Sequence, residues 1–177
     1  LMKMWKKLAA CVLAAAMALT LLTACGGGGG SAGGTTNPTT KEDMVISYVQ
    51  NYIKTNTGVS MSSSSVLKQL ASDEMSDAVA YLDASRASSN PNTDPEVLEK
   101  YKALYNGMNT ALLKLNKGGM FTTAAYEAMP TETQIGAFMK AYGVDSYIKT
   151  YGINEVGAAV TQENGLFYVV IIVARNV

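Results

Sequence analysis

The chain has 177 residues, with 14 basic and 14 acidic side chains, and 48% of its residues are hydrophobic. It contains no histidine, which excludes His-ligated zinc, Ser-His and Cys-His catalysis, and any imidazole proton relay. Beyond the first seven residues, no run of Lys or Arg and no basic patch is visible along the sequence, and this argues against a nucleic-acid partner.

The first 25 residues combine a basic start with an apolar run. The basic residues are Lys3, Lys6 and Lys7. Residues 8–22 are apolar, but the run is too short and too rich in Ala to predict a membrane-spanning helix. It ends in Leu22-Thr23-Ala24-Cys25, which resembles a bacterial lipobox, where the signal peptide is removed and the cysteine carries a lipid. We therefore predict a lipoprotein signal peptide over residues 1–24 and lipid attachment at Cys25. An ordinary secretory signal followed by a chance cysteine is the alternative.

Lipidation predicts a protein held at the cell membrane, on its extracytoplasmic face, by acyl chains such as palmitate. Removal of the leader discards Cys11 and three Lys residues, which leaves 11 basic against 14 acidic side chains and no free thiol. Residues 25–41 are rich in Gly and Thr, so we expect the lipidated cysteine to be followed by a flexible tether. Residues 42–177 are enough chain for one domain with a single core.

The first half of this domain carries the apolar periodicity of helices. Thr40-x-x-Asp43 predicts a helix start and Gly58 its end, with apolar residues at helical spacing between them. These residues are Val45, Tyr48, Val49, Tyr52 and Ile53. After a polar connector over residues 61–65, a second helix is predicted from about Ser72. Its inward stripe is Met75, Ala78, Val79 and Leu82.

Residues 87–95 are predicted to form a loop, and Asp94-Pro95 predicts the start of the next helix. The alternation of Asn90, Asn92, Asp94 and Glu96 is typical of a calcium-binding loop. However, Pro95 occupies the position of the sharp-turn glycine, and Tyr101 that of the final glutamate. A turn and a helix cap therefore explain these residues better than calcium does. Apolar residues continue the helical face at Val97, Leu98, Tyr101 and Leu104.

The second half of the domain mixes expected strands and helices. Residues 107–115 are predicted as a strand, residues 116–119 as a turn, and residues 124–129 as a helical turn that Pro130 interrupts. Thr131-x-x-Gln134 predicts the cap of a further helix that ends at Gly143. The buried residues of that helix are Ile135, Phe138 and Met139. A short helix is expected over residues 144–151.

The chain closes with a predicted hairpin. Residues 153–160 and 166–174 are its two strands, and Asn164-Gly165 supplies the positive φ values of a tight turn. Residues 166–174 are apolar without interruption, so we expect both faces of this strand to be covered. The elements together predict an α/β fold in which helices lie on both sides of a sheet.

Two stretches carry a family resemblance. From Phe138 to Gly157 the sequence fits, without a gap, the pattern W-M-x-S-P-G-H-R-x-N-I-L followed by E-V-G-V-G-V. Upstream, Gly107-Met108-Asn109-Thr110-Ala111 is similar to G-E-N-I-A. In both, the chain resembles bacterial members of the CAP superfamily, the SCP-like domains related to cysteine-rich secretory and pathogenesis-related proteins. The resemblance covers roughly residues 43–174. It implies a three-layer α-β-α sandwich, CAP-like, with the C-terminal antiparallel hairpin in the central sheet.

The departures from the family pattern bear on function. The family's cleft uses histidines and a glutamate, sometimes around a divalent metal. Met108 stands at the position of the glutamate in G-E-N and is followed by Asn109, and Val144 stands at the position of the histidine in G-H-R and is followed by Asp145. The resemblance therefore implies an apolar cleft formed by these four residues, with no catalytic residue, metal or cofactor.

We accordingly predict a membrane-anchored, CAP-like binding or scaffold module rather than an enzyme. Its partner would be a small apolar ligand, a cell-wall component or a protein. The alternative is a hydrolase with a carboxylate-based site, for which Asp73 with Asp77, or Asp145 with Glu155, supply carboxylates. A solvated surface accounts for these carboxylates more simply, because nothing in the sequence indicates a raised pKa.

Overall fold

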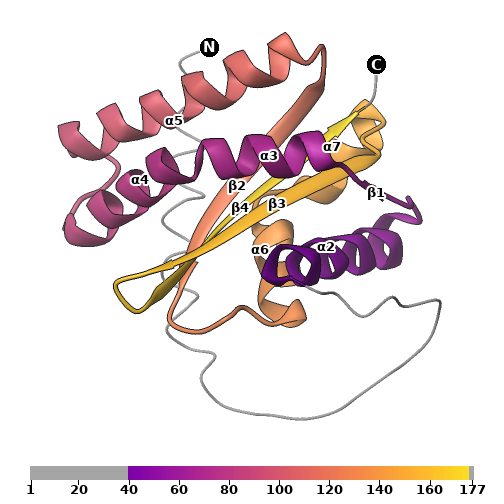
Figure 1. The fold of residues 1–177 in the computed structure, drawn as a ribbon, viewed down its shortest axis with the longest axis horizontal. Coiled ribbons are helices and arrows are strands. Elements are labelled where there is room, and N and C mark those ends of the chain that lie inside the picture. The colour runs from indigo at the N-terminus through magenta and orange to yellow at the C-terminus, as the bar shows by residue number, and fades with distance from the viewer. Residues whose placement is uncertain (1–39, 176–177) are drawn as a thin grey trace.

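The computed structural model describes residues 40–175 (Figure 1). Its elements in chain order are α2 (Lys41–Thr57), β1 (Ser62–Ser63), α3 (Ser65–Asp73), α4 (Met75–Ala87), α5 (Pro95–Lys114), β2 (Gly118–Tyr126), α6 (Glu132–Ala141), α7 (Val144–Tyr151), β3 (Glu155–Glu163) and β4 (Leu166–Arg175). The predicted signal peptide, Cys25 and nearly all of the predicted tether lie outside the described residues.

The strands form one mixed sheet in the order β1-β3-β4-β2. The strand β1 is parallel to β3, whereas β3, β4 and β2 are mutually antiparallel. The C-terminal hairpin is thus confirmed, and its strand β4 lies between β3 and β2. Asn164 and Gly165 form the turn with φ values of 51° and 80°, which a two-residue hairpin loop requires. The predicted α/β class is confirmed.

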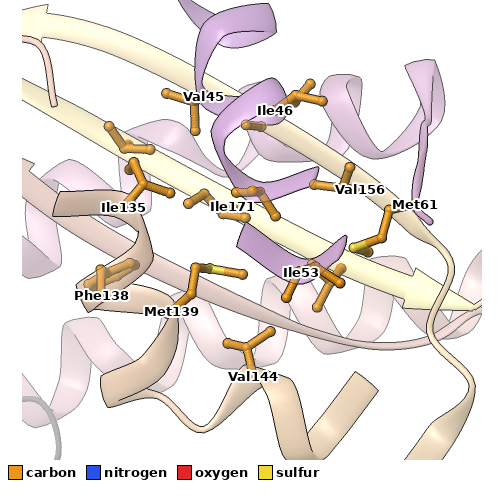
Figure 2. Packing of buried hydrophobic residues seen from close by; sticks show 14 of the residues in the cluster. Val45, Ile46, Ile53, Met61, Ile135, Phe138, Met139, Val144, Val156 and Ile171 are labelled. Atoms are coloured by element: carbon orange, nitrogen blue, oxygen red, sulfur yellow. The ribbon is translucent and has the colours of Figure 1, made fainter. Parts of the chain in front are cut away.

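Helices cover both faces of the sheet, and each face has its own buried cluster. The first face, covered by α2, α6 and α7, includes Val45, Ile135, Val144 and Ile171 (Figure 2). The second face, covered by α3, α4 and α5, includes Leu67, Met108 and Val170. Val170 and Ile171 are adjacent in β4 and enter different clusters, because successive side chains of a strand point to opposite faces. The prediction that both faces of β4 are covered is confirmed.

Local capping chemistry fixes most helix ends. The Thr40 side chain accepts a hydrogen bond from the Asp43 backbone N–H and starts α2. Thr131 and Gln134 form a reciprocal capping box at the start of α6. Asp94 caps α5, whose first residue is Pro95. These predicted helix starts are confirmed, as are the ends of α2 and α6 next to Gly58 and Gly143, which adopt left-handed backbone conformations.

The strand predicted over residues 107–115 is wrong, because residues 107–114 form the C-terminal part of α5 and Leu115 is its C-cap. Leu104, Met108 and Leu112 follow one another at four-residue spacing and are buried on the second face. This helical stripe outweighs the low helix propensity of Gly107. Gly107 has its own packing reason, since a Cβ atom there would lie 2.5 Å from Oε2 of Glu74.

Two further segments differ from expectation. The helical turn predicted over residues 124–129 is wrong: residues 124–126 end β2, which pairs with β4 along its whole length. Cross-strand pairing with the apolar β4 therefore decides the conformation of this Ala-rich segment. The polar connector predicted over residues 61–65 contains β1 and the start of α3. Neither element was predicted from the sequence, because the short strand and the N-cap residue Ser64 both lie within a run of Ser.

Candidate functional site

The four residues expected to form an apolar cleft do not come together. Met108 and Val144 are both fully buried, but Met108 belongs to the second-face cluster and Val144 to the first-face cluster. The sheet separates them, and Asn109 is exposed on α5. The expected single cleft is therefore not formed. The physical reason is that α5 extends through Gly107, and this places Met108 on the face of the sheet opposite Val144.

Asp145 instead takes part in a polar contact between helices of the first face. The Tyr52 hydroxyl of α2 donates a 3.0 Å hydrogen bond to Oδ2 of Asp145 in α7. Gly136 of α6 leaves room for the Tyr52 ring, since a Cβ atom there would lie 3.0 Å from Cδ2 of Tyr52. Burial, together with the hydrogen bond to Asp145 and the negative charge of that residue, raises the pKa of Tyr52 to about 12. Oδ1 of Asp145 is buried and has no hydrogen-bond partner among the described residues.

The carboxylates of the alternative hydrolase hypothesis contact other side chains or solvent. Asp145 bonds Tyr52, whereas Glu155 forms a 2.5 Å ion pair with Lys117. Asp73 and Asp77 are exposed, and Asp73 accepts a 2.7 Å hydrogen bond from Gln69. Within residues 40–175, no cluster of three or more Asp or Glu side chains is arranged to hold a metal ion. These contacts favour structural roles for the carboxylates.

Glu74 lies between Asp73 and Asp77 in the sequence. Its pKa is raised chiefly by burial and further by the charges of Asp77 and Asp73. Its carboxylate packs over Gly107 of α5.

Asp94, one of the residues considered for calcium, makes two local contacts. Its Oδ1 accepts a 3.0 Å hydrogen bond from the backbone N–H of Glu96, and its Oδ2 accepts one of 2.7 Å from the Ser88 hydroxyl. Asp94 therefore caps α5, in agreement with the sequence analysis.

A groove of about 470 Å³ runs along the outer edge of β3. One wall carries Glu42 from the start of α2, and the other carries Ser65, Lys68 and Ser72 from α3. The remaining lining residues are Gln69, Met75, Ala158, Ala159, Val160 and Thr161. Hydroxyl, amide and charged side chains thus line much of the groove, and a strand edge lies along it.

The pairing pattern shows which backbone groups of β3 face this groove. The carbonyl oxygens of Asn154 and Val156 accept hydrogen bonds from Ser62 and Ser64, on the outer side of β3. Peptide groups of a strand alternate between its two sides, so those of Ala158, Val160 and Gln162 also point outward. The partner strand β1 covers only Glu155 and Val156. Beyond Val156, the outer edge of β3 has no partner strand among residues 40–175.

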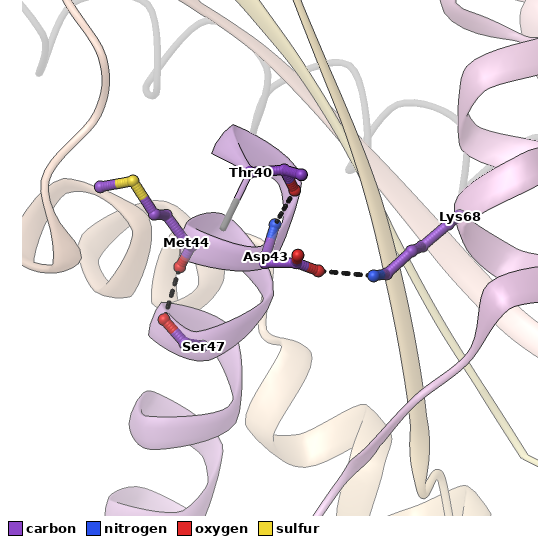
Figure 3. Close-up of polar contacts among 5 residues, drawn as sticks. All are labelled: Thr40, Asp43, Met44, Ser47 and Lys68. Atoms are coloured by element: carbon purple, nitrogen blue, oxygen red, sulfur yellow. Dashed lines mark hydrogen bonds and ion pairs between the residues drawn. The ribbon is translucent and has the colours of Figure 1, made fainter. Parts of the chain in front are cut away.

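An ion pair joins the two helices beside this edge. Nζ of Lys68 in α3 lies 2.5 Å from Oδ1 of Asp43 in α2 (Figure 3). Thr40 fixes the start of α2 by accepting a hydrogen bond from the Asp43 backbone, while the Asp43 side chain turns toward Lys68. No ion pair within the described part of the chain involves its neighbour Glu42. Among the described residues, the cation that lines the groove is therefore engaged by Asp43, whereas the carboxylate of Glu42 takes part in no ion pair.

Sequence reasoning missed this groove. Its walls come from segments that are distant in sequence, and Asp43 and Lys68 are 25 positions apart. One local signal was present: the Ser run over residues 62–65 directly precedes the apolar spacing of Leu67, Leu70 and Ala71. A capping residue before that spacing would have predicted α3, and with it the wall that carries Lys68.

Comparison with known proteins gives no relative: no family model matches the chain, and no curated protein or solved structure is significantly similar to it. None of the helices between residues 40 and 175 is long and apolar enough to span a bilayer. The functional proposal therefore depends on the sequence motifs and on the groove itself.

Proposed function

We propose that this chain is a membrane-anchored, extracytoplasmic binding or scaffold module, and that the groove beside β3 is its binding site. The observation that carries the proposal is the outer edge of β3, where the outward peptide groups of Ala158 and Val160 border a groove of about 470 Å³. Ligand sites are concave and place a small number of polar groups where they fix the orientation of the ligand. The groove has these properties.

The membrane anchor is the second part of the proposal. Its support is the sequence Leu22-Thr23-Ala24-Cys25 and the Gly-rich segment after it. A flexible tether from residue 26 to residue 41 would span roughly 20–24 Å root mean square. It would join the domain at α2, whose second residue Glu42 lines the groove. The groove would consequently lie near the outer surface of the membrane.

A CAP-like architecture is the third part. Its support is the covering of both sheet faces by helices, the hairpin of β3 and β4, and the helix pair α6 and α7 directly before it. The histidines and the glutamate of the family's cleft have no counterpart at Val144 and Met108. We therefore propose that the binding site has moved to the groove, where Glu42 is the sole carboxylate side chain among the lining residues. That composition favours binding over hydrolysis by a carboxylate pair.

Backbone amide NMR of the mature protein tests this proposal with three defined probe sets: capped octapeptides, soluble peptidoglycan fragments and medium-chain fatty acids. We expect at least one set to shift the amides of residues 158–161 and of Lys68 in a saturable manner. Shifts confined to the first-face helices, or no saturable shifts, would contradict the assignment of the groove as the binding site.

A further inference from the structure

The outer edge of β3 is a template for an added strand. The peptide groups of Ala158, Val160 and Gln162 point away from β4, and β1 pairs only with Glu155 and Val156. An unpaired strand edge presents N–H and C=O groups to which an extended chain can add. The edge also has an internal precedent, because β1 is itself a two-residue parallel strand that leaves the sheet where α3 begins.

The two walls fit the geometry of a strand. A strand added beside β3 would continue the plane of the sheet, and its side chains would point alternately to the two faces. On the first face they would meet the start of α2 with Glu42, and on the second face α3 with Lys68 and Ser72. The groove lies between these helices, with the edge of β3 along it, and an added strand has to pass the Asp43–Lys68 ion pair that joins the two walls. An extended polypeptide matches this shape.

The lining chemistry also favours a polypeptide over a small apolar ligand. Pockets for small molecules are lined mainly by apolar side chains with few polar groups. This groove instead combines the apolar side chains of Met75, Ala158 and Val160 with hydroxyl, amide and charged groups on Ser65, Gln69, Ser72, Lys68 and Glu42. Lys68 is held by Asp43, which leaves the Glu42 carboxylate as the charge available to a ligand. Complementary charge would select a basic residue at that end of the peptide.

We propose that the groove binds an extended polypeptide segment with a basic residue, which pairs with β3 as an additional strand. This inference rests on the proposed function, because it uses the same groove. The backbone of β3 supplies the hydrogen bonds common to all such ligands, and the wall residues select among side chains. The basic residue of the segment lies beside Glu42.

Substitution at Val160 separates backbone pairing from side-chain contact. Val160→Pro removes the outward N–H and places a ring at the edge. Pro is tolerated in an edge strand at a position where the backbone N–H would face solvent rather than the neighbouring strand. Val160→Ala shortens the same side chain and keeps the N–H. The probe is a phage-displayed library of random octapeptides, selected on the full mature protein in detergent micelles. Thermal melting of both variants checks that the fold is retained.

We expect the selected peptides to bind wild type and Val160→Ala with affinities within about three-fold, and Val160→Pro at least about ten-fold more weakly, since one backbone hydrogen bond and the close approach of the chain are lost. The amides of residues 158, 160 and 162 should exchange more slowly with solvent when peptide is bound. Glu42→Gln should bind basic peptides more weakly than wild type does, and its binding should no longer depend on salt concentration.

The outcomes distinguish this inference from the proposed function. If peptides, peptidoglycan fragments or fatty acids shift groove amides but Val160→Pro binds them as wild type does, the groove is a binding site and strand addition is wrong. If no probe perturbs the groove, both proposals fail. A concentration-dependent dimer that Val160→Pro abolishes would also overturn the inference, since the added strand would then come from a second copy of the chain.

Discussion

Asp43 at the start of α2 and Lys68 in α3 form a 2.5 Å ion pair between the helices on either side of the β3 edge. Their side chains are 31% and 34% exposed, and ion pairs of this kind contribute at most about 1 kcal/mol to stability. The pair is therefore better placed to hold the two walls of the groove in register than to stabilise the fold.

The variant Lys68→Met tests this role. We expect its free energy of unfolding to fall by less than about 1 kcal/mol, and its affinity for a groove ligand to change by more than that of Lys149→Met. Lys149 is exposed on α7, away from the groove, so it controls for loss of one positive charge. Chemical denaturation and isothermal titration of both variants make the comparison. Equal ligand affinities would show that the ion pair does not position the groove.

Adjacent residues of β4 should be equally intolerant of charge. Val170 and Ile171 are buried in opposite clusters, so Asp at either position would bury an unpaired carboxylate at a cost of several kcal/mol. That is comparable with the whole stability of a small domain, about 5–15 kcal/mol. Urea denaturation of Val170→Asp and Ile171→Asp should show severe loss of stability, whereas Val66→Asp, at a position that is 46% exposed, should not. A soluble Ile171→Asp variant with an unchanged melt would mean that this face of β4 is open.

Much of the fold could be predicted because its signals are local. Thr40 and Thr131 start helices through contacts within one turn, and Asn164-Gly165 fixes the hairpin through its own φ values. The helical conformation of the segment that begins at Gly107 has no such local signal, because Gly and Asn lower helix propensity. Only the burial of Met108 with Leu104 and Leu112 makes that segment a helix, and burial depends on the assembled sheet.

The candidate site could not be predicted because no single segment contains it. Glu42, Lys68 and Val160 come from two helices and a strand, and they meet only when α2 and α3 pack on opposite faces of the sheet. The residues that a family pattern would select, Met108 and Val144, are core residues in separate clusters. Pattern matching identifies such positions by spacing, whereas the groove depends on which edge of the sheet remains unpaired.

The Tyr52–Asp145 contact predicts a pH dependence at the alkaline end. The pKa of Tyr52 is raised from 10.0 to about 12 in the folded protein, so the folded state retains its proton when the unfolded state has lost it. This contribution is fully present below pH 10 and is lost as pH rises to about 12. Tyr52→Phe should therefore lose stability less steeply than wild type across this range.

At neutral pH the same substitution leaves Oδ2 of Asp145 without its donor, and we expect a loss of about 1–3 kcal/mol. Tyr151→Phe, at a position 52% exposed, is the matched control. Urea denaturation at several pH values from neutral to alkaline gives both quantities. Parallel stability curves for Tyr52→Phe and wild type above pH 10 would contradict the assigned pKa shift.

Lipid attachment at Cys25 has a direct chemical test. Cells expressing the full chain with labelled palmitate should incorporate the label into wild type and retain the protein in the membrane fraction, whereas Cys25→Ser should lose both. Cys11→Ser controls for the other cysteine, which lies within the predicted leader. Unchanged label and membrane fraction in Cys25→Ser would exclude the lipobox interpretation.

The central claim is that ligands bind in the groove between α2, α3 and the edge of β3, and filling the groove tests it most directly. Ser72 lines the groove from α3, whereas Ser76, four positions later, is exposed in α4 and does not line it. Ser72→Trp should abolish ligand-induced shifts at residues 158–161 with an unchanged melting temperature, and Ser76→Trp should leave them intact. Binding that survives Ser72→Trp at full affinity, with the protein folded, would contradict the account.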